Sequence, residues 1–456
     1  MNGVQIINDV MRKSLLFMLL LFANHVYLQS QSLSKDFAYN TSSPYCIIDV
    51  KDYTFDQLLN EGTNTIRRQL GVLNIPVKRF EFVIKGHIRN HHFTLNKGKH
   101  RLKNTSFRAI AYSYPSVTPK GEVIMLSGLL TLPITEDNKP TNMLVYHRIM
   151  APSYNIAPSN SLPIEAVLTA DNTICVFPDY YGCGITEGKP FAYTALNYHA
   201  RCATDCILAA FTIIKDIGIE LENDFYTWNV GYSQGGGYAL AMHKYIETVL
   251  PDSLACRINL KWSLCGDGIY TPIELYKQAL STRNMGSTPA VYLKGLQSIF
   301  YSHRECLGDL KLSDFFSDET LDKKLDSLLL DRDDSLWDMV IRLDELVKRI
   351  DPNYYFSPMA VDTNSTLFKA MATAFDLDNC ASGWHPTAPV VFFHSKKDSC
   401  IPYHTALKAY SLLADDNGNC YFYTPILNGS HVQTSVLFYA KLLRLCENEL
   451  FKQYTN

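Results

Sequence analysis

The stretch that decides the fold is "NVGYSQGGGYALAMHKY", residues 229–245. One serine stands between glycines, directly after a short apolar run and directly before a run of helical character. A tight turn alone would explain the glycines. A nucleophile held at the tip of that turn would explain the serine as well, and the rest of the sequence has to decide between the two interpretations.

Residues 231–235 read Gly-Tyr-Ser-Gln-Gly and fit the pattern G-x-S-x-G. The pattern gains meaning from its context, because a strand precedes it and a helix follows it. A serine on such a turn adopts a strained conformation that lifts its hydroxyl above the sheet. Neighbours two positions away crowd the turn and must be glycine. We therefore predict that Ser233 is a nucleophile.

Serine needs a base, and the base needs an acid that orients it. Asp398 follows the buried apolar run "VVFF", and His431 follows the next strand in the Gly/Ser-rich segment "TPILNGSHVQTS". Taken alone, Asp398 could be a helix-capping carboxylate and His431 a surface loop histidine. Their order after Ser233 and their places at strand ends favour a Ser-His-Asp triad.

Acyl transfer also needs two donors for the developing oxyanion. The backbone N–H of Gln234, the residue after the nucleophile, is the first candidate. The second is expected in the loop after an earlier strand, which points to "YHRIM", residues 146–150. We name Arg148, with Ile149 as the alternative. This mechanism requires no metal ion and no organic cofactor.

The pattern of strands and helices predicts an α/β fold. Runs rich in β-formers at 79–88, 107–117 and 121–134 indicate an N-terminal antiparallel meander. From residue 164 to 266 predicted helices and strands alternate, which indicates a mostly parallel central sheet. A helix is also expected within 54–70.

The alternation stops between residues 268 and 384, where the sequence reads as helices and polar linkers, and it resumes with "APVVFFHS". We predict an α/β core made of residues 33–267 and 385–456. Residues 268–384 are predicted to form a helical cap inserted into it. The Asp-rich run "DRDD" in this interval is interpreted as a solvated helix start rather than a metal site.

The N-terminus carries a targeting signal. Arg12 and Lys13 precede the apolar segment 14–28, and a polar stretch follows it. A basic start, a short apolar segment and a polar exit are typical of a secretory signal peptide, which we assign to residues 1–32. The protein is expected to be secreted or periplasmic, without stable membrane insertion after cleavage. An uncleaved anchor is the alternative.

Composition narrows the function further. The chain has 456 residues, 47% of them apolar and 19% charged, and a net charge of -3, which argues against nucleic acid as a partner. Its 12 cysteines are scattered rather than spaced as a disulfide scaffold, and no pairing is assigned. Cys202 and Cys206 stand one helical turn apart and could be a metal pair, although core packing is favoured.

The sequence resembles the α/β-hydrolase superfamily and is similar to its exported, secretory lipase and esterase-like group. The stretches "SGLLTLP", "VYHRIMAP", "VFPDYYGCG" and "VGYSQGG" carry the resemblance together with Asp398 and His431. It implies an esterase or lipase with a helical cap inserted before the acid. The group usually has Gly where this chain has Arg148, a side chain that would narrow the pocket or offer a charge to an acidic substrate.

These observations predict a serine hydrolase that cleaves small-molecule carboxylic esters through an acyl-enzyme. Two alternatives remain open from the sequence. One is an exopeptidase-type serine peptidase on the same fold, and the other is a non-catalytic binding protein on a hydrolase scaffold. The cap contains no motif that specifies the acyl group or the alcohol, and the oligomeric state is not specified either.

Overall fold

The structure is a computed structural model of the whole chain. It describes residues 45–70, 106–134, 139–150, 156–171, 173–189, 191–282, 289–317, 356–415 and 418–447, with a few single positions between them. The predicted signal peptide, residues 1–32, lies outside the described residues, as does the "DRDD" run at 331–334.

A single nine-stranded sheet runs through the core in the order β1-β2-β3-β5-β4-β6-β7-β8-β9. The strands are β1 (Cys46–Thr54), β2 (Ser106–Val117), β3 (Val123–Ile134), β4 (Asn142–His147), β5 (Thr173–Pro178), β6 (Tyr226–Tyr232), β7 (Leu260–Gly266), β8 (Val390–Phe393) and β9 (Cys420–Tyr423). Pairings from β1 to β5 through β2 and β3 are antiparallel, and those from β5 through β4 to β9 are parallel. The predicted fold class is confirmed.

The meander differs from the prediction in one strand. β1 was not predicted, because it is an edge strand whose residues are almost all exposed and therefore show no apolar alternation. The run 79–88 was predicted as a strand from its alternation, but its described positions Arg79, Phe82, Val83 and Gly86 are helical. The alternation there does not reflect a buried sheet face, since Phe82 is largely exposed.

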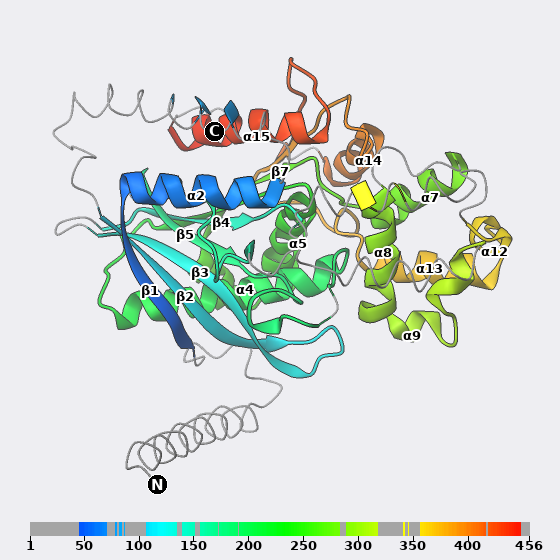
Figure 1. Cartoon of the computed structure of the whole chain (residues 1–456), viewed down its shortest axis with the longest axis horizontal. Helices are drawn as coiled ribbons and strands as arrows, with labels where there is room; N and C mark the ends of the chain where they lie inside the picture. The colour runs from blue at the N-terminus through cyan, green and yellow to red at the C-terminus, as the bar shows by residue number, and fades with distance from the viewer. Residues whose placement is uncertain are drawn as a thin grey trace, which may run out of the picture.

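Helices cover both faces of the sheet and define two apolar cores. Helices α4 (Leu196–Asp216) and α5 (Gln234–Thr248) pack on one face, and α2 (Phe55–Leu70), the 3₁₀ helix η4 (Ile164–Asp171) and α15 (His431–Glu447) pack on the other. Figure 1 shows α2 and α15 on the side of the sheet opposite α4. Helix α14 (Tyr403–Leu413) joins β8 to β9, and the short α6 (Asp252–Ile258) precedes β7.

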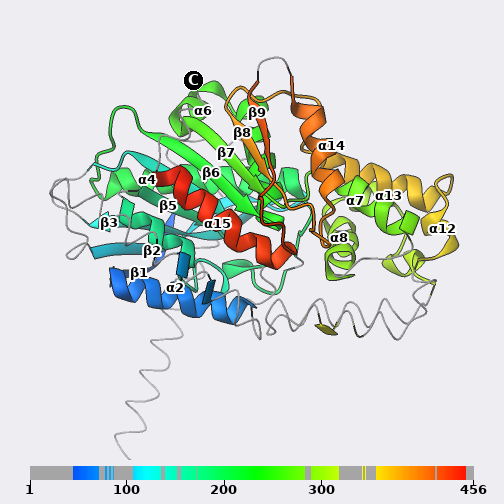
Figure 2. The ribbon, with the colours of Figure 1, turned by 90° about the horizontal axis from the view of Figure 1, so that it is seen from above.

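The described helices between β7 and β8 fall in the interval assigned to the cap. They are α7 (Pro272–Thr282), α8 (Pro289–Ser302), α9 (Arg304–Leu307), the 3₁₀ helix η6 (Leu312–Phe315), α12 (Pro358–Val361) and α13 (Thr366–Leu377). Figures 1 and 2 both show them gathered as one group beside the sheet. Phe375 of α13 packs on Tyr276 of α7, so the group shares an apolar interior.

A buried carboxyl group joins the cap to the core. Asp378, at the end of α13, accepts hydrogen bonds from the backbone N–H of Asn197 at 3.0 Å and from His303 Nε2 at 2.7 Å. Asn197 is the second residue of α4 in the core, whereas His303 precedes α9 of the cap. Burial raises the pKa of Asp378, and the neighbouring His303 opposes that rise. One side chain therefore connects three helices.

We expect Asp378→Ala to lower the free energy of unfolding by about 3 kcal/mol, because it leaves the His303 ring and the Asn197 N–H without their partner. Asp378→Asn keeps an acceptor and is expected to cost clearly less. Urea denaturation of both variants measures the difference. Equal losses in the two variants would contradict this role.

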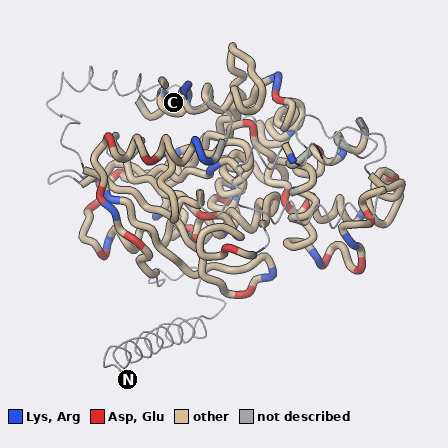
Figure 3. Tube along the Cα trace, in the orientation of Figure 1, with Lys and Arg blue, Asp and Glu red and all other residues tan. Residues whose placement is uncertain are grey.

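Charged residues of both signs are distributed along the described chain. Figure 3 shows acidic and basic residues interspersed over the core and the cap. Within the described part of the chain, every helix is too short or too polar to cross a membrane.

Candidate active site

The structure brings the three predicted catalytic residues together from three elements. Ser233 follows β6, Asp398 lies in the loop after β8, and His431 is the first residue of α15. His431 Nε2 is 2.8 Å from Ser233 Oγ, and His431 Nδ1 is 2.6 Å from Asp398 Oδ2. The sequence placed His431 in the loop before the last helix, whereas the helix begins at His431 itself. Both ring nitrogens of the histidine therefore have a partner.

Ser233 stands at a strained turn between β6 and α5. Its φ of 59° and ψ of -124° lie in a region that a residue with a side chain rarely adopts. The turn is held by the Ser233 N–H, which donates to Gly266 at 2.8 Å, and by the Gly236 N–H, which donates to the Ser233 carbonyl at 2.9 Å. The Ser233 residue is only 8% exposed.

The flanking glycines are required by close backbone approach. A Cβ on Gly231 would lie 1.9 Å from the carbonyl oxygen of Gly235, and a Cβ on Gly235 would lie 1.9 Å from that of His147. Such distances exclude any side chain without movement of the backbone. The end of β4 therefore packs directly against the turn that carries Ser233.

We expect Gly235→Ala to displace the backbone at His147 and Ser233 and to slow reaction of the serine on the order of 100-fold, since a shift of about 1 Å has that effect. Gly86→Ala is the matched control, because a Cβ there would meet no atom within 4 Å. Labelling of Ser233 by a fluorophosphonate measures both. Equal labelling rates would contradict the steric argument.

Charges around His431 favour its protonated form. Burial by itself lowers the pKa of His431, but the negative charge and hydrogen bond of Asp398 outweigh it, and the pKa is raised. Burial likewise raises the pKa of Asp398, and the opposing charge of His431 brings it below its usual value. Asp398 Oδ1 also accepts the N–H groups of Cys400 at 2.8 Å and Ile401 at 2.9 Å, which stabilise the carboxylate.

The raised pKa of His431 gives a pH dependence with a defined sign. A base must be neutral to accept a proton, so reactivity of Ser233 is lost as the pH falls through the pKa of His431. We expect the acid limb of the fluorophosphonate labelling rate to have an apparent pKa above about 6.5, the value of an unperturbed histidine. A limb at or below that value would contradict the assignment of His431 as base.

The two predicted oxyanion donors come from two segments next to the Ser233 turn, the start of α5 and the end of β4. Gln234 is the first residue of α5, and its side-chain Nε2 donates to the Tyr238 hydroxyl at 2.6 Å. Arg148 follows β4, whose last carbonyl packs against Gly235. The Tyr180 hydroxyl donates to the Arg148 carbonyl oxygen and holds this segment in place. The assignment of their N–H groups to an oxyanion stays a prediction.

The side chain of Arg148 does not have the environment expected from the sequence. Its guanidinium Nη1 donates to the Ile156 carbonyl oxygen at 2.6 Å, and the residue is 4% exposed. Its positive charge lowers the pKa of Glu165 and of Asp179, two carboxyl groups whose pKa is raised by burial. The buried positive charge of Arg148 therefore acts on buried acids of the protein itself.

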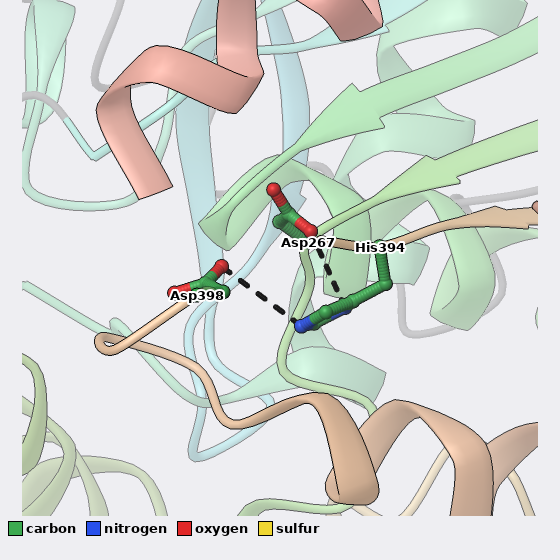
Figure 4. Close-up of side chains that lie close together, drawn as sticks. All are labelled: Asp267, His394 and Asp398. Atoms are coloured by element: carbon green, nitrogen blue, oxygen red, sulfur yellow. Dashed lines mark ion pairs between the residues drawn. The ribbon is translucent and has the colours of Figure 1, made fainter. Parts of the chain in front are cut away.

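Sequence reasoning missed the groups behind Asp398. Asp267 follows β7 and His394 follows β8, and Figure 4 shows the His394 ring between the Asp267 and Asp398 carboxyl groups. The Tyr232 hydroxyl donates to Asp267 and lies 2.6 Å from the His431 carbonyl oxygen. Their positions directly after two predicted strands could have revealed them, because the carboxyl ends of neighbouring parallel strands meet at one edge of a sheet.

The possible cysteine metal pair is buried in α4. Cys206 Sγ lies 3.0 Å from the Tyr112 hydroxyl, and Cys202 Sγ accepts a hydrogen bond from Ser116 at 3.5 Å. Neither Cys202 nor Cys206 forms a disulfide. Both pair members thus have core neighbours, as expected for packing residues.

Comparison with solved structures identifies the fold. The esterase LipA of Xanthomonas oryzae superposes with a TM-score of 0.66 over 90% of this chain and 98% of its own, at 17% identity. A Legionella pneumophila protein described as a hydrolase gives a TM-score of 0.62 over 89% and 98%, at 16% identity. Candida antarctica lipase A gives 0.51 over 72% and 73%, at 14% identity.

The chain has the α/β-hydrolase fold. No protein-family model and no curated protein matches the sequence. At these identities the likeness concerns the fold alone. Within the α/β-hydrolase fold, the turn at Ser233 and the two loops after β8 and β9 occupy the strand ends at which ligands of open α/β sheets bind.

Proposed function

We propose that the protein is a serine hydrolase that cleaves carboxylic esters with Ser233, His431 and Asp398. The observation that carries the proposal is the continuous hydrogen-bonded chain from Ser233 Oγ through both nitrogens of His431 to Asp398, on a serine held at φ 59°. A turn without chemical function would not need a strained serine with a histidine at 2.8 Å from its hydroxyl.

In the proposed reaction Ser233 Oγ attacks the acyl carbon while His431 Nε2 takes the hydroxyl proton. The resulting imidazolium is stabilised by Asp398, which also fixes the ring with Nδ1–H as donor. His431 returns the proton to the leaving alcohol, and an acyl-enzyme remains. Water, deprotonated by the same histidine, then releases the acid and restores Ser233. The N–H groups of Gln234 and Arg148 are the proposed oxyanion donors.

Ester substrates are favoured by the comparisons and by the cap. LipA is described as an esterase and the Candida antarctica protein as a lipase, both with this fold. Tyr292 of α8 in the cap is a buried side chain whose pKa is raised by burial and, to a smaller extent, by Cys400 and by Asp398 of the triad. We propose that α8 contributes to the acyl or alcohol site.

Ser233→Ala is expected to abolish fluorophosphonate labelling and to lower ester turnover on the order of 10⁶-fold, because no other group on the turn can form the acyl-enzyme. The substrates are p-nitrophenyl esters of increasing acyl length. Ser411→Ala, at an exposed serine of α14, is the matched control and should behave as the wild type.

Aminoacyl p-nitroanilides, tested beside the esters, distinguish the exopeptidase alternative from the proposed esterase. Turnover of the anilides with little turnover of any ester would replace the esterase assignment and leave the triad standing. A folded wild type that neither labels nor turns over either substrate would favour the binding-protein alternative.

We also propose that the protein is exported, on the strength of the N-terminal segment with Arg12, Lys13 and the apolar run 14–28. N-terminal sequencing of protein recovered outside the expressing cell is expected to begin near residues 30–32. Recovery of the chain only inside the cell, with Arg12 still present, would contradict export.

A further inference from the structure

His394 lies between two buried carboxyl groups on the Asp398 side of the triad (Figure 4). Its Nδ1 is 3.5 Å from Asp267 Oδ1, and its Nε2 is 3.9 Å from Asp398 Oδ2. All three side chains are 0% exposed. Any charge on these groups must therefore be balanced within the protein, because water cannot screen it.

The hydrogen bonds show where protons are needed. His394 Nε2 lies 2.8 Å from the Ile401 carbonyl oxygen, which can only accept, so Nε2 carries a proton. Nδ1 has no hydrogen-bond partner among the described residues and faces Asp267 Oδ1. If His394 were neutral and Asp267 ionised, two bare acceptors would face each other. One further proton must therefore belong to this pair.

The donors around Asp267 favour its ionised form. Its Oδ1 accepts the Ser395 N–H at 2.9 Å, and its Oδ2 accepts the Tyr232 hydroxyl. The ionised form leaves no bare acceptor at Nδ1, since a doubly protonated His394 then faces the carboxylate. The His431 carbonyl near Tyr232 belongs to the first residue of α15 and accepts a bond within the helix, so it does not need the tyrosine proton.

We propose that His394 is a buried imidazolium that keeps Asp267 ionised, and that the Asp267 charge raises the proton affinity of His431. The pair acts as a set of positioning residues for the base, and this inference rests on the proposed function. Tyr232 transmits the arrangement, because its hydroxyl lies between Asp267 and the His431 backbone.

Other titratable groups that face the pair come from every surrounding element. They are Tyr232 of β6, Tyr270 after β7, Asp398 after β8, Tyr403 of α14 and His431 of α15. Burial raises the pKa of Tyr232 and Tyr270, so both stay neutral in the range of interest. Burial raises the pKa of Asp267 to about 6 against the opposing charge of His394. Without that charge Asp267 would bind a proton.

A metal ion fits this cluster less well than a proton does. Donor atoms of Asp267, His394 and Asp398 lie within 4.8 Å of one another. However, the two carboxyl groups face different nitrogens of the ring, and Nε2 already donates to Ile401. A single cation could not replace both contacts, whereas a doubly protonated imidazole satisfies them together.

The test is the pH dependence of fluorophosphonate labelling of Ser233 in Asp267→Asn, in His394→Gln and in the double variant. Asn tolerates the positive φ of 37° at position 267, and the Gln amide can still donate to Ile401. Each single variant removes the Asp267 charge, the second by protonating it. Both single variants are therefore expected to move the acid limb of the labelling rate to lower pH by roughly half a unit or more. The double variant is expected to show the same shift as each single variant.

Two results would overturn the proposal. An unshifted limb in Asp267→Asn would mean that the pair is uncharged, and a limb moved to higher pH in His394→Gln would mean that Asp267 stays ionised without the histidine. Tyr403→Phe is the matched control, because its ring packs against His394 while its hydroxyl bonds Thr424 at 3.0 Å. It should leave the limb unchanged. If His394→Gln does not fold, Asp267→Asn decides alone.

A second readout separates this inference from the proposed function. The C2–H proton resonance of His431 is titrated by NMR in Ser233→Ala with and without Asp267→Asn, which needs no reactive serine. A lower pKa of His431 in the Asp267→Asn variant, found when the wild type neither labels nor hydrolyses esters, would contradict the proposed function alone. An unshifted titration in a protein whose wild type labels and hydrolyses esters would contradict the ion pair alone.

Discussion

The backbone turn at Ser233 is the constraint on which the rest of the site depends. A φ of 59° costs the chain about 1–3 kcal/mol and persists only where the surrounding structure fixes it. Here β6 and β7 fix it from below through the Gly266 carbonyl, and the end of β4 fixes it from the side at Gly235. The hydroxyl therefore points where the ends of the parallel strands bring a histidine and a carboxylate. The geometry of the site therefore depends directly on the pairing of the strands.

The sequence predicted those parts of the structure whose cause is local. The turn at Ser233 is local, since the glycines that permit it lie two residues away. Asp398 and His431 each follow a recognisable strand, and chain order completed the set. By contrast, β1 forms at a sheet edge where no buried face imposes an apolar pattern, so nothing in "CIIDVKDYT" marked it as a strand. The alternation at 79–88 misled because alternation indicates a strand only where a core covers one side.

Other groups could not be predicted, because their roles arise from contacts between distant segments. Asp378 joins α4, α9 and α13, which are separated by long stretches of sequence. Arg148 lies in the stretch predicted to supply an oxyanion donor, yet its side-chain charge lowers the pKa of the buried Glu165 and Asp179. Burial explains both cases: an ionisable group in the interior needs a partner, and the partner is chosen by the fold rather than by the neighbouring residues.

The same rule bears on the base itself. With Ser233 8% exposed and the His431 side chain 14% exposed, charges near the imidazole act through a medium that screens them weakly. Asp398 contacts the imidazole directly, and Asp267 adds the effect of its charge from behind. A buried carboxylate keeps its charge only beside a cation, and in our proposal that cation is His394. A buried site that uses one histidine as base thus gains from a second histidine that never meets the substrate.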